Sequence, residues 1–269
     1  MRNNEIQRVS IKRRKKRNGG GCLSYMLVIC FSAVLAIVVA FNLYLASLKP
    51  ISNFDEIQPN PVTTIYSADG ENIKTFTAYT FSKVELADVP EQLKEAIIAT
   101  EDKNFYRHHG YDIFGLFRSS IQNVLARRVV QGASTITQQL ARILFLSNER
   151  TMTRKIKELV IAARIEKTIS KDKILELYLN TIYFGSDFYG IRQASRGYFG
   201  KEPKELELPE STMLAGLPNA PSLYSPYVDF MLAKKRQFIV IDAMQNNGYI
   251  SKDIAESAKI QPLYLAQEK

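Results

Sequence analysis

The sequence predicts a mainly α-helical fold, preceded by one transmembrane helix and opened by a small β-hairpin. Residues 22–48 form an uncharged, mostly apolar run of 27 residues. Residues 61–76 carry β-forming residues on both sides of Asp69-Gly70, a dipeptide typical of tight hairpin turns. From Pro90 onward, apolar residues recur at the three- and four-residue spacing of helices. The composition, 46% hydrophobic and 23% charged over 269 residues, excludes a wholly disordered chain and allows a sizeable core.

The apolar run 22–48 is long enough to cross a membrane. As a helix it would extend about 40 Å at about 1.5 Å per residue, more than a hydrocarbon core of about 30 Å. The run also exceeds the apolar region of about 7–15 residues found in a cleaved signal peptide, which is the alternative interpretation. We therefore expect a single-pass, uncleaved signal anchor, with the following residues outside the cytoplasm.

Positive charge is concentrated in the tail 1–21. The tail has eight basic residues and one acidic residue, so it holds +7 of the net charge of +9. The remaining 28 basic and 26 acidic residues nearly balance, which argues against nucleic acid as a partner. Because basic segments stay on the cytoplasmic side and are attracted to anionic lipids, we expect a cytoplasmic N-terminus.

Residues 49–60 are polar and marked by prolines, as a linker is, and they precede a domain over 61–269. Serine and threonine are favourable helix N-caps, and proline suits the first turn of a helix. The expected helices cover 91–100, 113–125, Ser134 to about Leu146, Thr151 or Thr153 onward, Ser170 to about Ile182, Pro209 to about Pro218, and Ser251 onward.

Two adjacent carboxylates, Glu101 and Asp102, end a predicted helix and lead into a loop of aromatic, histidine and glycine residues (EDKNFYRHHG, 101–110). A carboxylate that is partly removed from water has a raised pKa, which suits a general base. The alternative is a solvated helix end whose charges pair with Lys103 and Arg107. The two adjacent histidines have no spaced histidine or cysteine beside them and do not predict a metal site.

A second segment, QGASTITQQ (131–139), places a glycine turn before a capped helix, whose free N–H groups can seat an anion. Helical spacing aligns Thr135, Gln138, Gln139 and Arg142 in one polar stripe opposite apolar residues. Amides and hydroxyls along such a stripe suit a sugar. The alternative is an ordinary solvent-facing side of a helix.

A third segment, 150–158, brings Arg150, Arg154 and Lys157 to the same helical face as Glu158. Arginine makes fork-like contacts with phosphate oxygens, so this face suits a diphosphate. The alternative is a plain pair between Arg154 and Glu158, four residues apart, worth about 0.3 kcal/mol.

Together these segments resemble the peptidoglycan glycosyltransferase family, the polymerase module of class A penicillin-binding proteins and of its monofunctional relatives. EDKNFYRHHG is similar to the family's E-D-x-x-F-x-x-H-x-G motif, QGASTITQQLAR to Q-G-G-S-T-I-T-Q-Q-L-x-K, and RKIKE to R-K-x-x-E. ILELYLNTIYFG, GIRQASRGYFGK and MLAGLPNAPSLYSP resemble the remaining blocks in order, so the resemblance covers about 60–250. No Ser-x-x-Lys, Ser-x-Asn and Lys-Thr-Gly set follows them, so we expect the monofunctional type, without a transpeptidase.

The resemblance implies a lysozyme-like, two-lobed fold, whose smaller, membrane-facing jaw we place at about 111–130. It implies that lipid II is polymerised into glycan strands, with inversion and release of undecaprenyl diphosphate. Glu101 then matches the general base for the acceptor's 4-hydroxyl, and Glu158 matches the glutamate that assists the departing diphosphate. The resemblance also implies substrate-binding roles for Asp102, Phe105, His108, Ser134, Thr135, Gln138, Gln139, Arg142, Arg150, Arg154 and Lys157.

The sequence requires no cofactor and offers no metal cage; a divalent cation, Mg²⁺ or Mn²⁺, at the diphosphate is a candidate. Three residues depart from the family's pattern: Ala133 stands where glycine is usual, Arg142 where lysine is usual, and Ile143 where asparagine is common. The replacement of asparagine by Ile143 puts one polar contact of that helix in doubt. The expected partners are lipid II, the growing glycan strand, the lipid bilayer of a bacterial cell, and transpeptidase, divisome or elongation proteins. The alternatives are a catalytically weak cell-wall scaffold and a lytic glycan hydrolase.

Overall fold

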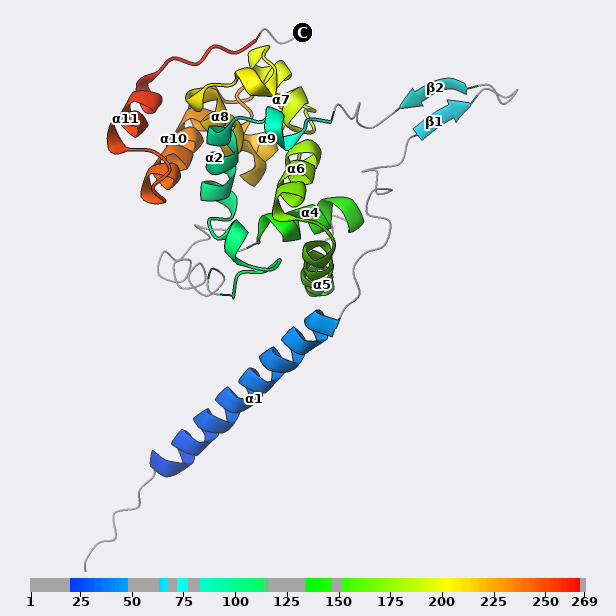
Figure 1. The fold of residues 1–269 in the computed structure, drawn as a ribbon, viewed down its shortest axis with the longest axis vertical. Helices are drawn as coiled ribbons and strands as arrows, with labels where there is room; N and C mark the ends of the chain where they lie inside the picture. The colour runs from blue at the N-terminus through cyan, green and yellow to red at the C-terminus, as the bar shows by residue number, and fades with distance from the viewer. Residues whose placement is uncertain are drawn as a thin grey trace, which may run out of the picture. The chain divides into compact units, whose positions relative to one another are not determined.

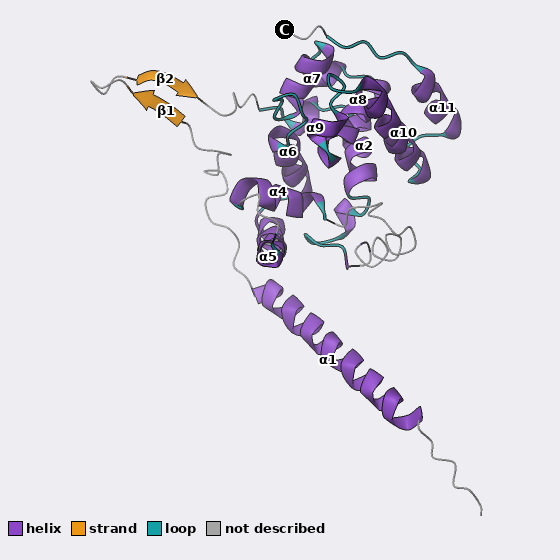
Figure 2. Cartoon of the chain, turned by 180° about the vertical axis from the view of Figure 1, so that it is seen from behind, coloured by secondary structure: helices purple, strands orange, loops and turns teal. Residues whose placement is uncertain are grey.

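The computed structural model describes residues 20–47, 63–66, 72–76, 83–113, 115, 134–146 and 151–266. The chain divides into two compact units, 1–47 and 48–269, and each is described by itself. Regular structure among the described residues is helical apart from one two-stranded sheet and an isolated bridge (Figure 2). The predicted mainly α fold is therefore confirmed. The tail over 1–19 and the linker lie outside the described residues.

The first unit contains one long helix, α1 (Gly20–Ser47). Its segment Tyr25–Tyr44 has a mean hydropathy of 2.7 and is long and apolar enough to cross a membrane. A signal sequence near an N-terminus has the same length and composition. The helix confirms the predicted apolar span, and its insertion in a membrane is taken up below as a proposal.

The predicted hairpin is present as strands β1 (Thr63–Tyr66) and β2 (Asn72–Phe76). They pair antiparallel, with Thr63 opposite Phe76 and an irregular register after Ile65. The turn at 67–71, where the Asp-Gly dipeptide lies, is outside the described residues.

The second unit continues with short 3₁₀ turns and a series of α-helices (Figure 1). These are η2 (Leu86–Asp88), α2 (Glu91–Glu101), η3 (Phe105–Arg107), α4 (Ile136–Phe145), α5 (Met152–Thr168), α6 (Lys171–Thr181), α7 (Ile191–Phe199), η4 (Pro203–Glu205), α8 (Leu208–Gly216), η5 (Leu217–Asn219), α9 (Pro221–Tyr224), α10 (Phe230–Asn246) and α11 (Lys252–Ile260). Helices α2, α4, α5, α6, α8 and α11 confirm predicted ones, whereas α7 and the long α10 were not predicted. The pattern at 113–125 and the jaw at 111–130 fall largely outside the described residues.

Three of the predicted helix caps are confirmed and one is wrong. Thr151, Ser170 and Ser251 each accept a hydrogen bond from a backbone N–H in the first turn of α5, α6 and α11. Helix α4 is capped by Thr135, which accepts from the N–H of Gln138, and not by Ser134 as predicted. The helix begins one residue later than expected, and the Ser134 hydroxyl instead accepts a hydrogen bond from Lys155 at 2.7 Å.

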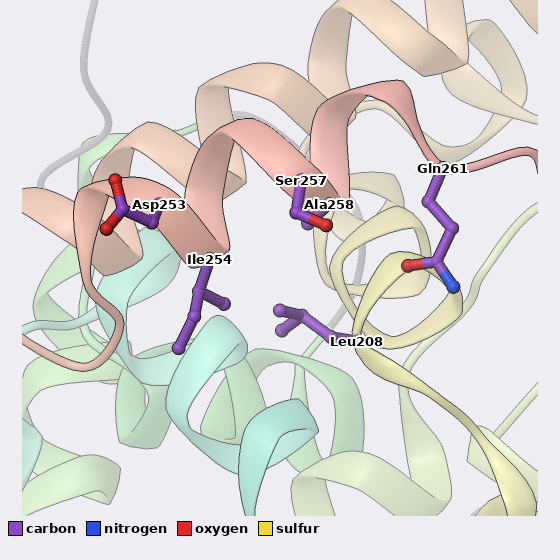
Figure 3. A pocket seen from close by; sticks show the side chains of 6 residues that line it. All are labelled: Leu208, Asp253, Ile254, Ser257, Ala258 and Gln261. Carbon is purple, nitrogen blue, oxygen red and sulfur yellow. The ribbon is translucent and has the colours of Figure 1, made fainter.

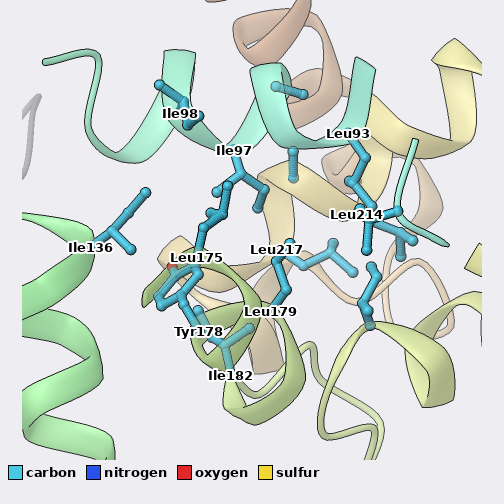
Figure 4. Close-up of a cluster of buried hydrophobic side chains, with 14 of the residues drawn as sticks. Leu93, Ile97, Ile98, Ile136, Leu175, Tyr178, Leu179, Ile182, Leu214 and Leu217 are labelled. Atoms are coloured by element: carbon cyan, nitrogen blue, oxygen red, sulfur yellow. The ribbon is translucent and has the colours of Figure 1, made fainter. Parts of the chain in front are cut away.

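One apolar core joins two sets of helices. Helices α2, α8 and α10 pack on one another, and α4 packs on α5 and α6. Figure 4 shows side chains of α2, α4, α6 and α8 meeting in the interior, among them Leu93, Ile136, Tyr178 and Leu214, which are all fully buried. Burying one such side chain contributes about 1.5–3 kcal/mol. The C-terminal end of α2 is thereby fixed against α4, and the site is built there.

Candidate active site

Glu101 is the last residue of α2, and its side chain is only 10% exposed. Its Oε2 atom accepts a hydrogen bond of 2.8 Å from the Nε2 atom of Gln139 on α4. Its Oε1 atom is buried and has no hydrogen-bond partner among the described residues. The Nη2 atom of Arg236, on α10, lies 4.0 Å from Oε1. One carboxylate oxygen therefore accepts a hydrogen bond, and the other is a buried acceptor that has none among the described residues.

The surroundings of Glu101 favour a carboxylate that can take up a proton. Burial raises the pKa of the Glu101 carboxyl above its ordinary value, and the negative charge of Asp102 adds to this. The hydrogen bond from Gln139 and the positive charges of Arg236 and Arg142 lower the pKa part of the way back. A carboxylate with a raised pKa and one oxygen without a hydrogen-bond donor is suited to general base catalysis.

Asp102 has a different role from Glu101, because both of its oxygens are engaged inside the protein. The Nε2 atom of His108 lies 3.0 Å from Oδ1 and 2.8 Å from Oδ2 of Asp102, and the N–H of Ile136 donates to Oδ2 at 3.1 Å. The N–H of Gly110 donates to Nδ1 of His108, so Nε2 must carry the proton that His108 donates to Asp102. Asp102 thus ties the loop after α2 to the start of α4, and His108 keeps no free nitrogen for a metal.

Gly110 joins the first predicted segment to the second and brings it against helix α5. Its carbonyl oxygen accepts hydrogen bonds from Oγ1 of Thr135 at 2.8 Å and from Nε2 of Gln138 at 3.3 Å. Its φ is +90°, and a Cβ atom there would lie 3.0 Å from the backbone carbonyl carbon of Ala162 on α5. Only glycine fits this conformation and this close approach without strain. The loop after α2 can therefore pack directly on α4 and α5.

Three of the four residues of the polar stripe face the protein interior and Arg142 is partly buried, so the alternative interpretation as a solvent-facing helix side is wrong. Thr135, Gln138 and Gln139 are all less than 9% exposed. Gln139 also accepts a hydrogen bond of 3.2 Å from the hydroxyl of Tyr178 on α6. Ile143, which stands where the family has asparagine, is partly buried and packs against the core. Phe105 is fully buried too, with the Lys171 ammonium 4.5 Å from its ring centroid.

The cationic segment surrounds a buried glutamate. Glu158 is 1% exposed; its Oε2 atom accepts from Nζ of Lys155 at 2.8 Å, and its Oε1 atom lies 3.4 Å from Nε of Arg154. Lys155 also donates to Ser134 and to Oε1 of Gln138, so it joins the second segment to the third. Lys157 is exposed, and Arg150 lies outside the described residues.

The sequence analysis missed Lys155 and Arg236. Lys155 could have been found, because it stands three residues before Glu158, a spacing that brings two side chains together on a helix. Arg236 had no such signal, because it lies far from Glu101 along the chain and only the packing of α10 on α2 brings them together.

The residues described around these carboxylates do not fit a divalent cation. Glu158 already accepts from Lys155 beside Arg154, and Asp102 already accepts from His108 and Ile136. Hard cations need several free oxygen ligands. Over the described ranges no group of three histidine, cysteine, aspartate or glutamate side chains is arranged to hold a metal ion.

A cavity of about 300 Å³ lies between α8 and α11 and contains none of the predicted site residues. Figure 3 shows Leu208 and Ile254 directed toward each other in it, with Asp253, Ser257 and Gln261 at its border. Three of its six lining residues are polar and three are apolar.

Residues 69–245, about two thirds of the chain, match the family described as transglycosylase. The chain belongs to this transglycosylase family. This confirms the peptidoglycan glycosyltransferase family that the six sequence blocks predicted. The match spans every described site residue, from Glu101 to Arg236.

Among similar proteins, penicillin-binding protein 1A of Neisseria cinerea is 41% identical over 243 residues, which are 90% of this chain and 30% of that protein. Penicillin-binding protein 1A of Vibrio cholerae is 40% identical over 237 residues, 88% of this chain and 29% of that protein. The chain thus spans about a third of the length of these relatives. The crystal structure of penicillin-binding protein 1A from Haemophilus influenzae aligns with 79% of this chain and 22% of that one, at 25% identity and a TM-score of 0.43.

Proposed function

We propose that this transglycosylase family member is a peptidoglycan glycosyltransferase that polymerises lipid II into glycan strands. The observation that carries the proposal is the buried Glu101 carboxylate, which accepts a hydrogen bond from Gln139 on one oxygen and has no hydrogen-bond partner among the described residues on the other. Family membership supplies the reaction class, and the Glu101 geometry supplies a general base for it.

In the proposed reaction, Oε1 of Glu101 removes the proton from the 4-hydroxyl of the acceptor's N-acetylglucosamine. The hydroxyl oxygen forms a bond to C1 of the donor's muramyl sugar, while the bond from C1 to the diphosphate oxygen breaks with inversion. The undecaprenyl diphosphate leaves with the bonding electron pair. A positioned base contributes roughly 10²–10⁴ in rate.

The cluster around Glu158 is proposed to receive the departing diphosphate. Arg154 lies with its Nε atom 3.4 Å from Oε1 of Glu158, and this ion pair keeps the guanidinium charge beside the buried glutamate. Lys155 has three acceptors, namely Ser134, Gln138 and Glu158, and these hold its charge in place. Positive charge fixed where the leaving group gathers negative charge lowers the barrier electrostatically. We assign no step to a divalent cation.

The helix α1 is proposed to anchor the enzyme in a bacterial cell membrane, with the basic tail in the cytoplasm and the catalytic unit outside. Its apolar segment supports insertion, and the charge of the tail supports this orientation. The substrate carries a lipid chain, so an anchored catalytic unit would stay at the surface where lipid II resides. Transpeptidases and proteins of the division or elongation machinery are the proposed protein partners.

The test is polymerisation of labelled lipid II by the detergent-solubilised chain, beside Glu101→Gln and a control, Glu91→Gln. Glu91 is on the same helix but exposed, and it pairs only with Lys94 among the described side chains. We expect long strands from the wild type and from Glu91→Gln, and none from Glu101→Gln. If all three bind lipid II and none makes strands, the protein is a scaffold. Release of soluble sugar from finished peptidoglycan would identify a hydrolase.

A further inference from the structure

Arg236 is held in a defined position beside Glu101 by two other contacts. Its Nε atom donates to the backbone carbonyl of Gly216, at the end of α8, at 3.2 Å. Its guanidinium carbon lies 5.6 Å from the ring centroid of Tyr224 on α9. The side chain is only 13% exposed. A planar guanidinium fixed at Nε and over a ring keeps its remaining N–H groups in one orientation, and one of them faces Glu101.

The separation of 4.0 Å between Nη2 of Arg236 and Oε1 of Glu101 is longer than a hydrogen bond. Arg236 therefore acts on Glu101 through its charge and leaves Oε1 free to accept a proton. Gln139 engages the opposite oxygen, Oε2, from the other side. Glu101 thus lies between α4 and α10, with one oxygen hydrogen-bonded and the other without a hydrogen bond among the described residues.

The charged and titratable groups around Glu101 come from four helices. Asp102, which follows α2, opposes the ionised form, whereas Arg142 on α4 and Arg236 on α10 favour it. Tyr178 on α6 stays a neutral donor, because burial raises the pKa of its phenol well above the ordinary value. If Arg236 is removed, Arg142 is the remaining cation among the described groups that lowers the pKa of Glu101. Burial and the charge of Asp102 still raise it.

We propose that Arg236 is a positioning residue of this active site, which keeps the Glu101 carboxylate ionised and its Oε1 atom directed at the acceptor hydroxyl. This inference rests on the proposed function of Glu101 as the general base. The sequence motifs that predict the site all lie before α10 in the chain. The proposal adds a residue of α10 to them.

The experiment compares initial rates of lipid II polymerisation from about pH 5 to about pH 9. The variants are Arg236→Gln, which removes the charge, and Arg236→Lys, which keeps it. Lys235→Gln is the matched control, because Lys235 is the exposed neighbour on the same helix. We expect the rate of Arg236→Gln at neutral pH to be roughly 10- to 100-fold below that of the wild type. In the plot of rate against pH, the acidic limb, where Glu101 becomes protonated, should move to higher pH. Arg236→Lys should leave that limb near its wild-type position, and Lys235→Gln should match the wild type.

A purely structural role of Arg236 would lower the rate at every pH without moving the acidic limb, and that result overturns the proposal. A wild-type rate and profile for Arg236→Gln overturns it as well, and so does an equal shift of the limb in Arg236→Lys. Circular dichroism and thermal unfolding report whether each variant folds; if Arg236→Gln does not, the position of the limb in Arg236→Lys decides. Failure of the proposed function is a separate outcome, because the wild type itself would then make no strands.

Discussion

The side-chain amide of Gln139 donates a hydrogen bond of 2.8 Å to the Glu101 carboxylate and fixes the base against helix α4. The orientation of this amide is set in turn by Tyr178, whose hydroxyl donates to its carbonyl oxygen at 3.2 Å. The three residues come from α2, α4 and α6, and each is enclosed by the core. The base is therefore positioned by helix packing rather than by a loop.

Replacing Gln139 by leucine should move the acidic limb of the activity profile to higher pH. The hydrogen bond from Gln139 lowers the pKa of Glu101, so its loss raises that pKa further and leaves less carboxylate at neutral pH. A hydrogen bond to a charged group is worth about 1.5–3 kcal/mol, so we expect a fall of roughly ten-fold or more in rate. Rates measured across pH test this, with the exposed Gln261→Leu as control. An unmoved limb contradicts the role given to Gln139.

Glu101→Gln should make the folded protein more stable above the ordinary glutamate pKa, although it abolishes activity. The pKa of Glu101 is raised above the model-compound value of 4.5 in the folded state, so the folded state binds more protons than the unfolded state as pH rises past 4.5. Stability from this group is therefore present at low pH and is lost as pH rises through the folded pKa. Glutamine does not ionise, so the Glu101→Gln variant does not lose this stability as pH rises.

Thermal unfolding at several pH values measures the effect. The melting temperature of Glu101→Gln should exceed that of the wild type at neutral pH, by about 2–4 °C for each kcal/mol gained. The difference should shrink as pH falls toward 4.5. If the difference in melting temperature between Glu101→Gln and the wild type is the same at every pH, burial of the Glu101 charge does not cause it.

Much of the site was predictable because helical spacing and capping residues are local signals. Apolar periodicity located α2, so Glu101 could be placed at its end, and the caps Thr151 and Ser170 fixed the starts of α5 and α6. The sequence blocks identified the family, which supplied a role for Glu101 that periodicity alone left open.

What could not be predicted depends on contacts between distant segments. Gln138 and Gln139 are polar, and only the packing of α4 on α5 and α6 shows that they are buried. Helix α10 carries charged residues among apolar ones without a clear stripe, so neither the helix nor Arg236 was expected. The expected helical face includes Lys157, whereas the structure directs Lys155 at Glu158.

Substitution of the two lysines near Glu158 should have very different effects on stability. Lys155→Met removes the 2.8 Å partner of a carboxylate that is 1% exposed and leaves Arg154 as its cation at 3.4 Å; because Lys155 itself is 38% exposed, we expect a loss of about 1–3 kcal/mol. Lys157→Met removes an exposed charge and should change stability by less than about 0.5 kcal/mol. Denaturant unfolding measures both.

The double variant Lys155→Met with Glu158→Leu provides the control for this comparison. Removing the buried carboxylate together with Lys155 leaves only Arg154, which is 18% exposed, without its ion pair, so it should recover part of the stability that Lys155→Met loses. No recovery would mean that Lys155 stabilises the protein chiefly through Ser134 and Gln138.

Gly110→Ala should be far more destabilising than Gly248→Ala, although both glycines have positive φ. Gly110 has φ of +90° and Gly248 has φ of +80°, so an alanine costs about 1–2 kcal/mol in backbone strain at either position. The added methyl group at Gly248 would meet nothing within 4 Å. At Gly110 it would lie 3.0 to 3.2 Å from backbone atoms of Ala162 and Ala163, which cannot rotate away. Overpacking of this kind costs about 1–3 kcal/mol more.

The same methyl group would push the loop after α2 away from α5 and disturb the hydrogen bonds that the Gly110 carbonyl accepts from Thr135 and Gln138. Gly110→Ala should therefore lose activity as well as stability, whereas Gly248→Ala should lose only a little stability. Thermal unfolding and strand synthesis on both variants test this. Equal losses of stability at the two positions would show that the close approach to Ala162 is not what requires glycine at 110, since backbone strain alone would then account for both.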